Sequence, residues 1–122
     1  FSYDGQYILN PALRENREYI CQVVNDIVTR YDVDGLHIDD YFYPYPVAGQ
    51  PIPDQRNFQQ DPRGFSNIND WRRDNVDVFV KELGETIHKA KPLVFTAIKR
   101  PTLVTEVGRM DFKTTMISMP MY

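Results

Sequence analysis

The stretch that decides the fold is VDGLHIDDYFYPYP, residues 33–46, where an apolar run ends in two aspartates and then becomes aromatic. Successive side chains on a strand point to opposite faces. Leu36 and Ile38 therefore share one face, while His37 and Asp39 share the other. Because an aliphatic strand face packs against helices in an α/β protein, we expect His37 and Asp39 to point away from the helices, with Asp39 at the carboxyl end.

Strand and helix patterns alternate along the chain on both sides of this stretch. Two apolar stripes at helical spacing predict amphipathic helices, and short apolar runs predict strands before and after them. The expected order is strand 7–9, helix 11–31, strand 33–39, helix 70–91 and strand 93–98. A helix that leads at once into a buried strand is half of a strand–helix–strand unit, so we expect an α/β fold with a parallel sheet.

Two segments interrupt this alternation. Residues 40–69 contain five prolines and two glycines and are expected to form a long loop, which in a compact domain is usually functional. Residues 99–122 show no clean periodic pattern. We therefore expect residues 1–122 to be part of one domain, with a poorly matched tail from residue 99 onward.

Composition restricts the kinds of partner. The 122 residues are 42% hydrophobic and 25% charged, with a net charge of -3, which is typical of a globular domain. The basic residues are scattered, so no nucleic acid partner is expected. No apolar run approaches the roughly 20 residues of a membrane span, and no signal peptide is visible. The single cysteine, Cys21, falls on an apolar helix face and is expected to be buried.

The two aspartates are neighbours in the chain but diverge in direction. Asp39 projects toward the carboxyl ends of the strands, where active sites of strand–helix barrels lie. Asp40 begins the loop and can accept hydrogen bonds from backbone groups there. The alternative is that both carboxylates only stabilise a turn, since Asp is common in turns. Because adjacent side chains diverge, a metal site with His37 has no strong spacing motif, and no metal or cofactor is assigned.

Two residues outside the central stretch are further candidates for the site. Asn10 ends the first expected strand, at the same edge of the sheet as Asp39. It can cap the following helix together with Pro11, contact a substrate, or do both. Trp71 opens the second long helix, where Asn69 or Asp70 is the expected cap. It either packs internally or faces the long loop and helps to close a cleft.

Three separated blocks carry a family resemblance: LNP at 9–11, YDVDGLHIDDYFYPYP at 31–46 and WRRDNV at 71–76. With these blocks in this order, residues 6–92 resemble the glycosyl-hydrolase-like family ten barrels, once catalogued as a domain of unknown function. The resemblance implies a (β/α)8 TIM barrel, of which this chain holds about strands three to five. It also suggests a secreted or cell-envelope location.

The segment GLHID, residues 35–39, is also similar to the strand-four motif of the α-amylase-type barrels, in which a terminal aspartate is the nucleophile. This similarity implies that Asp39 is the nucleophile and that His37 is the inward basic residue beside it. The second carboxylate, the acid/base, is expected outside these 122 residues. On their own they are therefore expected to be inactive.

The resulting hypothesis is a glycoside hydrolase that acts on a poly- or oligosaccharide. Its substrate contacts are expected from residues that offer flat rings or polar groups to a sugar: His37, Asp40, Tyr41, Tyr43, Tyr45, Asn10 and Trp71. The prolines among the rings fix φ and reduce the ordering cost of binding. The alternative for the rings is that they only plug the end of the barrel. The alternatives for the function are a non-catalytic carbohydrate-binding barrel and a metal-dependent TIM-barrel enzyme.

Overall fold

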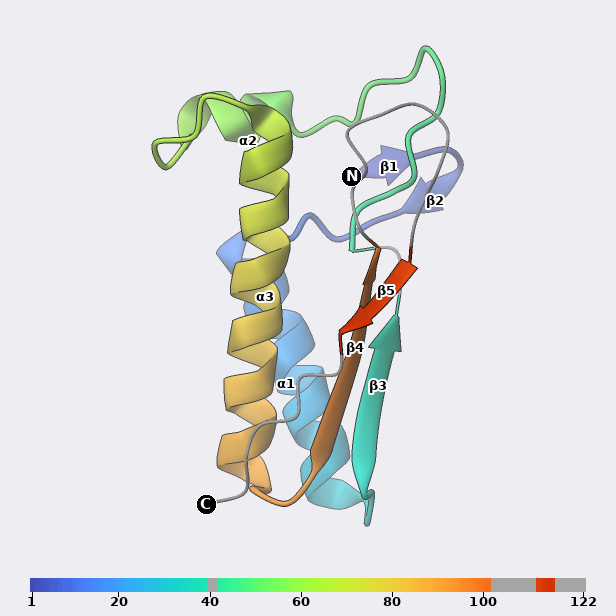
Figure 1. Ribbon diagram of the computed structural model, residues 1–122, viewed down its shortest axis with the longest axis vertical. Helices are drawn as coiled ribbons and strands as arrows, with labels where there is room; N and C mark the ends of the chain where they lie inside the picture. The colour runs from blue at the N-terminus through green and yellow to red at the C-terminus, as the bar shows by residue number, and fades with distance from the viewer. Residues whose placement is uncertain (40–41, 102–111, 116–122) are drawn as a thin grey trace.

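A computed structural model describes the backbone of residues 1–39, 42–101 and 112–115, and the side chains of residues 1–38 and 42–94. Two long helices lie side by side against one face of a small sheet (Figure 1). The elements, in chain order, are β1 Ser2–Tyr3, β2 Gln6–Tyr7, α1 Arg14–Arg30, β3 Gly35–Asp39, α2 Gln55–Gln60, α3 Ile68–Ala90, β4 Phe95–Pro101 and β5 Phe112–Thr115. The mixed order of helices and strands confirms the α/β class.

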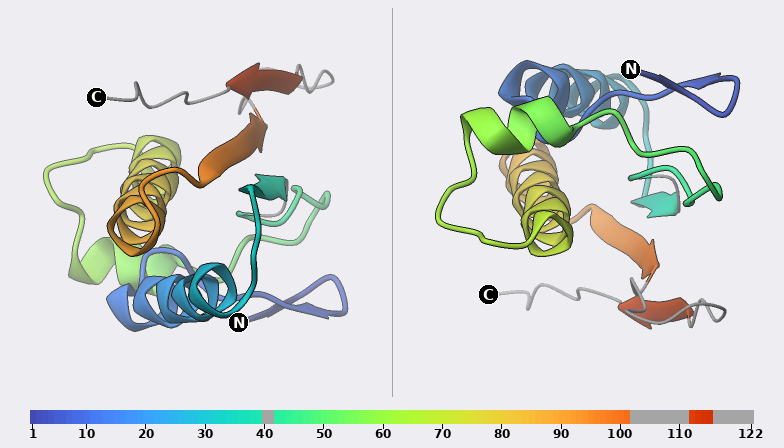
Figure 2. Two further views of the ribbon diagram at one scale, coloured as in Figure 1. Left: turned by 90° about the horizontal axis from the view of Figure 1, so that it is seen from below. Right: turned by 90° about the horizontal axis from the view of Figure 1, so that it is seen from above.

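The main sheet has the order β3-β4-β5. Strands β3 and β4 are parallel, with Gly35 opposite Phe95 and Asp39 opposite Lys99. The connection between them contains α3, so β3, α3 and β4 form a strand–helix–strand unit. Figure 2, which views the molecule from both ends, shows α1 and α3 on the same side of these strands. Strand β5 runs antiparallel to β4, and the described strands do not close into a barrel.

The first expected strand, residues 7–9, is wrong. Of these residues only Tyr7 is in a strand, and β2 pairs antiparallel with β1 instead of joining the main sheet. Asp4 and Gly5 make the two-residue turn between them, and both have a positive φ. An Asp-Gly pair in this conformation favours a tight hairpin, because its twist matches that of the flanking strands. The turn at Asp4 and Gly5 therefore places Tyr7 in a local hairpin, and the apolar run does not form a strand of the main sheet.

The two long helices form as expected, but both start elsewhere. Helix α1 begins at Arg14 rather than at residue 11, because the side chain of Asn10 accepts a hydrogen bond from the Ala12 N–H at 3.0 Å and closes a separate turn first. Helix α3 begins at Ile68, and its cap is Asn67, which accepts from the Asn69 N–H at 2.8 Å. The expected loop also contains a short helix, α2.

The core lies between α1, α3 and the sheet. Its buried members are Cys21, Val24, Val28, Phe42, Phe79, Val80, Leu83 and Ile87. Leu36 and Ile38 pack against this cluster, while His37 between them is exposed. The aliphatic face of β3 therefore lies on the helices, as the alternation predicted, and Cys21 is buried as expected.

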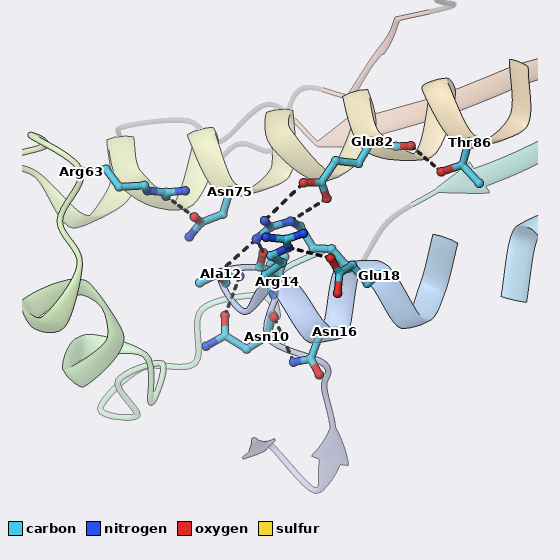
Figure 3. Close-up of polar contacts among 11 residues, drawn as sticks. Asn10, Ala12, Arg14, Asn16, Glu18, Arg63, Asn75, Glu82 and Thr86 are labelled. Atoms are coloured by element: carbon cyan, nitrogen blue, oxygen red, sulfur yellow. Dashed lines mark hydrogen bonds and ion pairs between the residues drawn. The ribbon is translucent and has the colours of Figure 1, made fainter. Parts of the chain in front are cut away.

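An ion pair fastens the start of α1 to the middle of α3. Arg17 is only 8% exposed and donates to Glu82 at 2.8 Å, and it also donates to the carbonyl oxygens of Pro11 at 2.9 Å and Ala12 at 3.2 Å. Figure 3 shows Glu82 reaching from α3 toward the turn at Asn10 and Ala12. The turn that precedes α1 is thus fixed relative to α3 by one guanidinium group.

Replacing Val28 by alanine should lower the free energy of unfolding by about 2 kcal/mol, because two buried methyl groups are lost and a small cavity remains. Val28 is 0% exposed, whereas Val23 on the same helix is 42% exposed. The matched variant Val23→Ala should change stability by less than about 0.5 kcal/mol. Chemical denaturation of both variants measures the difference, and equal effects would contradict this account of the core.

Candidate functional site

The candidate site surrounds the carboxyl end of β3 and the loop that follows it. Strand β3 ends at Asp39, as expected, next to the parallel strand β4. His37 is exposed on the sheet face that does not contact the helices. The side chain of Asp39 and residues 40–41, with the candidates Asp40 and Tyr41, lie outside the described part of the chain. That Asp39 shares the face of His37 therefore stays a prediction.

The aromatic block after β3 divides into core residues and partly exposed ones. Phe42 is buried, and its ring centroid lies 6.0 Å from that of Phe79 on α3. Tyr43 and Tyr45 are half-buried. The hydroxyl oxygen of Tyr43 accepts a hydrogen bond from the side-chain amide of Asn75 at 2.8 Å. Phe42 thus plugs the end of the core, while each of the two tyrosines keeps part of its surface exposed.

The Tyr43 hydroxyl is held in its neutral form. Burial raises the pKa of Tyr43 well above its usual value, because a phenolate is poorly solvated in the interior. The hydrogen bond from Asn75 favours the phenolate and offsets only part of this effect. Tyr43 therefore keeps its proton throughout the physiological pH range.

The raised pKa of Tyr43 predicts a loss of stability in alkali. The folded state holds the Tyr43 proton more tightly than the unfolded chain does. The contribution of this hydroxyl to the free energy of unfolding is therefore complete below the unfolded pKa of about 10 and falls as the pH rises above it. Between about pH 10 and 12, wild-type protein should lose stability more steeply than a Tyr43→Phe variant. Denaturant titrations across this range measure both slopes; parallel slopes would contradict the prediction.

A buried ion pair fixes the middle of the long loop to α3. Asp54 is 0% exposed and accepts two hydrogen bonds from the Arg72 guanidinium, at 2.8 and 2.5 Å. Arg72 also donates to Asn69 at 3.1 Å. Charge-assisted, two-point contacts of this kind are the strongest polar contacts between side chains. The loop is therefore ordered where it crosses the start of α3.

Tyr3 provides a second anchor for the same loop. Its hydroxyl donates to the carbonyl oxygen of Gln50 at 2.8 Å and accepts from the Val47 N–H at 2.9 Å. Tyr3 is only 2% exposed, so these contacts are shielded from water. Together with Asp54 and Arg72, they hold the loop beside the N-terminal hairpin (Figure 1).

Trp71 anchors the loop from inside and presents no open ring to a ligand. It is 2% exposed, and its indole N–H donates to the carbonyl oxygen of Asp61 at 2.9 Å. The Phe58 ring packs edge-on against it at 5.5 Å, and the Arg63 guanidinium covers it at 5.5 Å. Of the two alternatives for Trp71, these contacts support internal packing, and the buried ring leaves little surface for a substrate.

Asn10 is likewise occupied by the protein. It is 3% exposed, its oxygen accepts from the Ala12 N–H, and its amide donates to Asn57 of α2 at 3.2 Å. Asn10 therefore closes a turn before α1 and ties it to the loop. Asn10 is therefore not the cap of α1, and its buried amide, already bonded within the protein, leaves little surface for a substrate.

Two features of the described residues bear on other kinds of site. Among the side chains that the structure describes, no group of three or more His, Cys, Asp and Glu is arranged to hold a metal ion. Within the same part of the chain, no helix has the length and apolar character to cross a membrane.

A parallel strand–helix–strand unit with polar and aromatic residues beyond its strand ends is typical of α/β enzymes and ligand-binding proteins, which bind at that edge. The sequence model of the family glycosyl hydrolase-like 10 matches residues 3–113. The chain belongs to this family.

Relatives with curated names support the same assignment. "Glycosyl hydrolase YngK" of Bacillus subtilis is 47% identical over 94 residues, which cover 76% of this chain and 18% of the relative. "Glycosyl hydrolase DigH" of Escherichia coli K12 is 32% identical over 87 residues, covering 71% of this chain and 20% of the relative. The chain thus spans about a fifth of the length of these relatives.

Proposed function

We propose that the protein containing this chain is a glycoside hydrolase with a TIM-barrel fold that cleaves a poly- or oligosaccharide. The observation that carries the proposal is the family match across β3, its loop and α3, with relatives named glycosyl hydrolases. The parallel pairing of β3 and β4 and the helix-facing side chains of Leu36 and Ile38 support it, because both are expected of adjacent barrel strands.

In this proposal Asp39 is the catalytic carboxylate at the end of a barrel strand. Glycosidases commonly use two carboxyl groups, one that attacks the sugar or activates water and one that protonates the leaving oxygen. The second group comes from a part of the protein beyond these residues. A separation of about 5 Å between the two groups leads to retention of anomeric configuration, and one of roughly 6.5–9.5 Å leads to inversion.

Sugar contacts are assigned to the residues around this carboxylate. His37, exposed on β3, and the half-buried Tyr43 and Tyr45 each leave surface for a ligand. Asp40 and Tyr41 connect the strand to these rings in the sequence. Tyrosine suits this role because its ring packs on sugar C–H groups while its hydroxyl bonds sugar oxygens.

The test is an activity assay on the full-length protein. It is incubated with cellulose, xylan, chitin and purified bacterial cell walls, and new reducing ends are measured. We expect reducing ends from at least one substrate, with no loss in the presence of a chelator. Binding without cleavage would favour a non-catalytic carbohydrate-binding barrel, and loss of cleavage on chelation would favour a metal-dependent enzyme.

A further inference from the structure

Three side chains form a hydrogen-bonded series that ends at Tyr43. Arg63 donates to the side-chain oxygen of Asn75, and the Asn75 amide donates to the hydroxyl oxygen of Tyr43 at 2.8 Å. Figure 3 shows the first of these contacts, with Arg63 reaching Asn75 on α3. Asn75 is 0% exposed. Arg63 is itself held by Asp74 at 3.4 Å and by the face of Trp71.

This series has only one possible direction. A guanidinium group donates hydrogen bonds and accepts none. The Asn75 oxygen must therefore face Arg63, which turns the Asn75 NH₂ group toward Tyr43. Because the Tyr43 oxygen accepts from that group, the hydroxyl hydrogen of Tyr43 has to point away from Asn75. Arg63, through its contact with Asn75, thus sets the orientation of the Tyr43 hydroxyl in the loop after β3.

We propose that Asn75 and Arg63 are positioning residues that direct the Tyr43 hydroxyl to donate a hydrogen bond to an oxygen of the bound carbohydrate. The inference rests on the proposed function and adds the direction of one contact in the same site. Tyr43 follows Asp39 by four residues, so the two Cα atoms are at most about 14 Å apart. A phenol that keeps its proton can donate at any physiological pH, and sugars present many acceptor oxygens.

The decisive variant is Asn75→Asp. It keeps the size of the side chain, and its carboxylate still accepts from Arg63, but it offers Tyr43 an acceptor instead of a donor. The Tyr43 hydroxyl should then turn inward and be lost to the ligand. Tyr43→Phe removes the same hydroxyl directly. Asn25→Asp, which adds the same charge at an exposed position of α1, is the matched control.

Binding is measured calorimetrically on the full-length protein, with oligosaccharides prepared by partial hydrolysis of the three polysaccharides and the cell walls named above. Asn75→Asp and Tyr43→Phe should each weaken binding about threefold to tenfold, the effect of one hydrogen bond. The double variant should be no weaker than either single one, because both remove the same donor. Asn25→Asp should bind like wild type. Additive losses, or full binding by Asn75→Asp, would overturn the inference.

Neutron diffraction provides a second test that needs no sugar, because it shows the direction of the O–D bond of Tyr43. If Asn75 had only a structural role, this direction would not change in Asn75→Asp. In wild type the deuterium on the Tyr43 oxygen should point away from Asn75, and in Asn75→Asp it should point at the new carboxylate. A wild-type deuterium directed at Asn75, or at any other protein acceptor, would refute the positioning role. Lack of all oligosaccharide binding would instead count against the proposed function, so the two failures can be told apart.

Discussion

Replacing Asp39 by asparagine in the full-length protein is expected to lower the turnover of its polysaccharide by about a thousandfold or more. An amide of the same shape can neither attack a sugar carbon nor take a proton from water, so the chemical step fails. Ground-state contacts to the sugar need no charge at this position, and binding should stay within about threefold. This combination, with turnover lost and binding kept, distinguishes a catalytic carboxylate from one that only stabilises a turn.

The matched control is Asp34→Asn, which makes the same chemical change at an exposed residue just before β3. It should leave both turnover and binding unchanged. Unfolding of each variant must also be compared, because a turn-stabilising aspartate would show its loss there. If Asp39→Asn keeps most of the wild-type turnover, the nucleophile is elsewhere and the similarity of GLHID to the α-amylase-type motif carries no catalytic meaning.

The features that could be predicted are those with a local physical cause. The phase of β3 follows from alternation, since Leu36 and Ile38 can be buried together only if His37 is not. The parallel pairing with β4 follows from the helix between them. The β1–β2 hairpin could also have been predicted, because Asp4 and Gly5 are a standard two-residue turn signal. The short apolar run that follows them favoured a strand at residues 7–9 instead.

The residues that hold the loop could not be predicted, because their partners are distant in the chain. Asp54 pairs with Arg72, 18 positions away, and Tyr43 pairs with Asn75, 32 positions away. A proline-rich stretch shows that a long loop is present but not which side chains anchor it. The one available signal is that Arg72 opens an amphipathic helix next to such a loop, which makes it a reasonable partner for a loop carboxylate.

The same reason left the roles of two site candidates, Trp71 and Asn10, open in the sequence. For Trp71 the sequence left internal packing and closure of a cleft as alternatives, and its burial depends on Phe58 and Arg63, whose positions the local pattern does not predict. The side chain of Asn10 suits both a cap and a sugar contact, and only its contacts in the folded protein show which groups it bonds. Side chains that can act in a site are also those that can satisfy buried backbone groups, so residue type alone does not separate the two.

Replacing Arg72 by leucine should lower the free energy of unfolding by about 3–5 kcal/mol, because it leaves the buried carboxylate of Asp54 without its cation. Leucine keeps the apolar stem of the side chain, so the loss reflects charge and hydrogen bonding rather than packing. Arg72→Lys keeps the charge but cannot make the two-point contact, and should cost about 1 kcal/mol. Denaturation of the full-length protein gives the order wild type, Arg72→Lys, Arg72→Leu.

Limited proteolysis locates this effect, because the ion pair joins the loop to α3. Cleavage within residues 42–67 should rise sharply in Arg72→Leu, while α1 stays protected. The double variant Asp54→Asn with Arg72→Leu should recover part of the lost stability, since a neutral pair leaves no buried charge unpaired. A double variant as unstable as the sum of the two single ones would show that Asp54 and Arg72 act independently, and the loop would then owe its order to Tyr3 and Trp71.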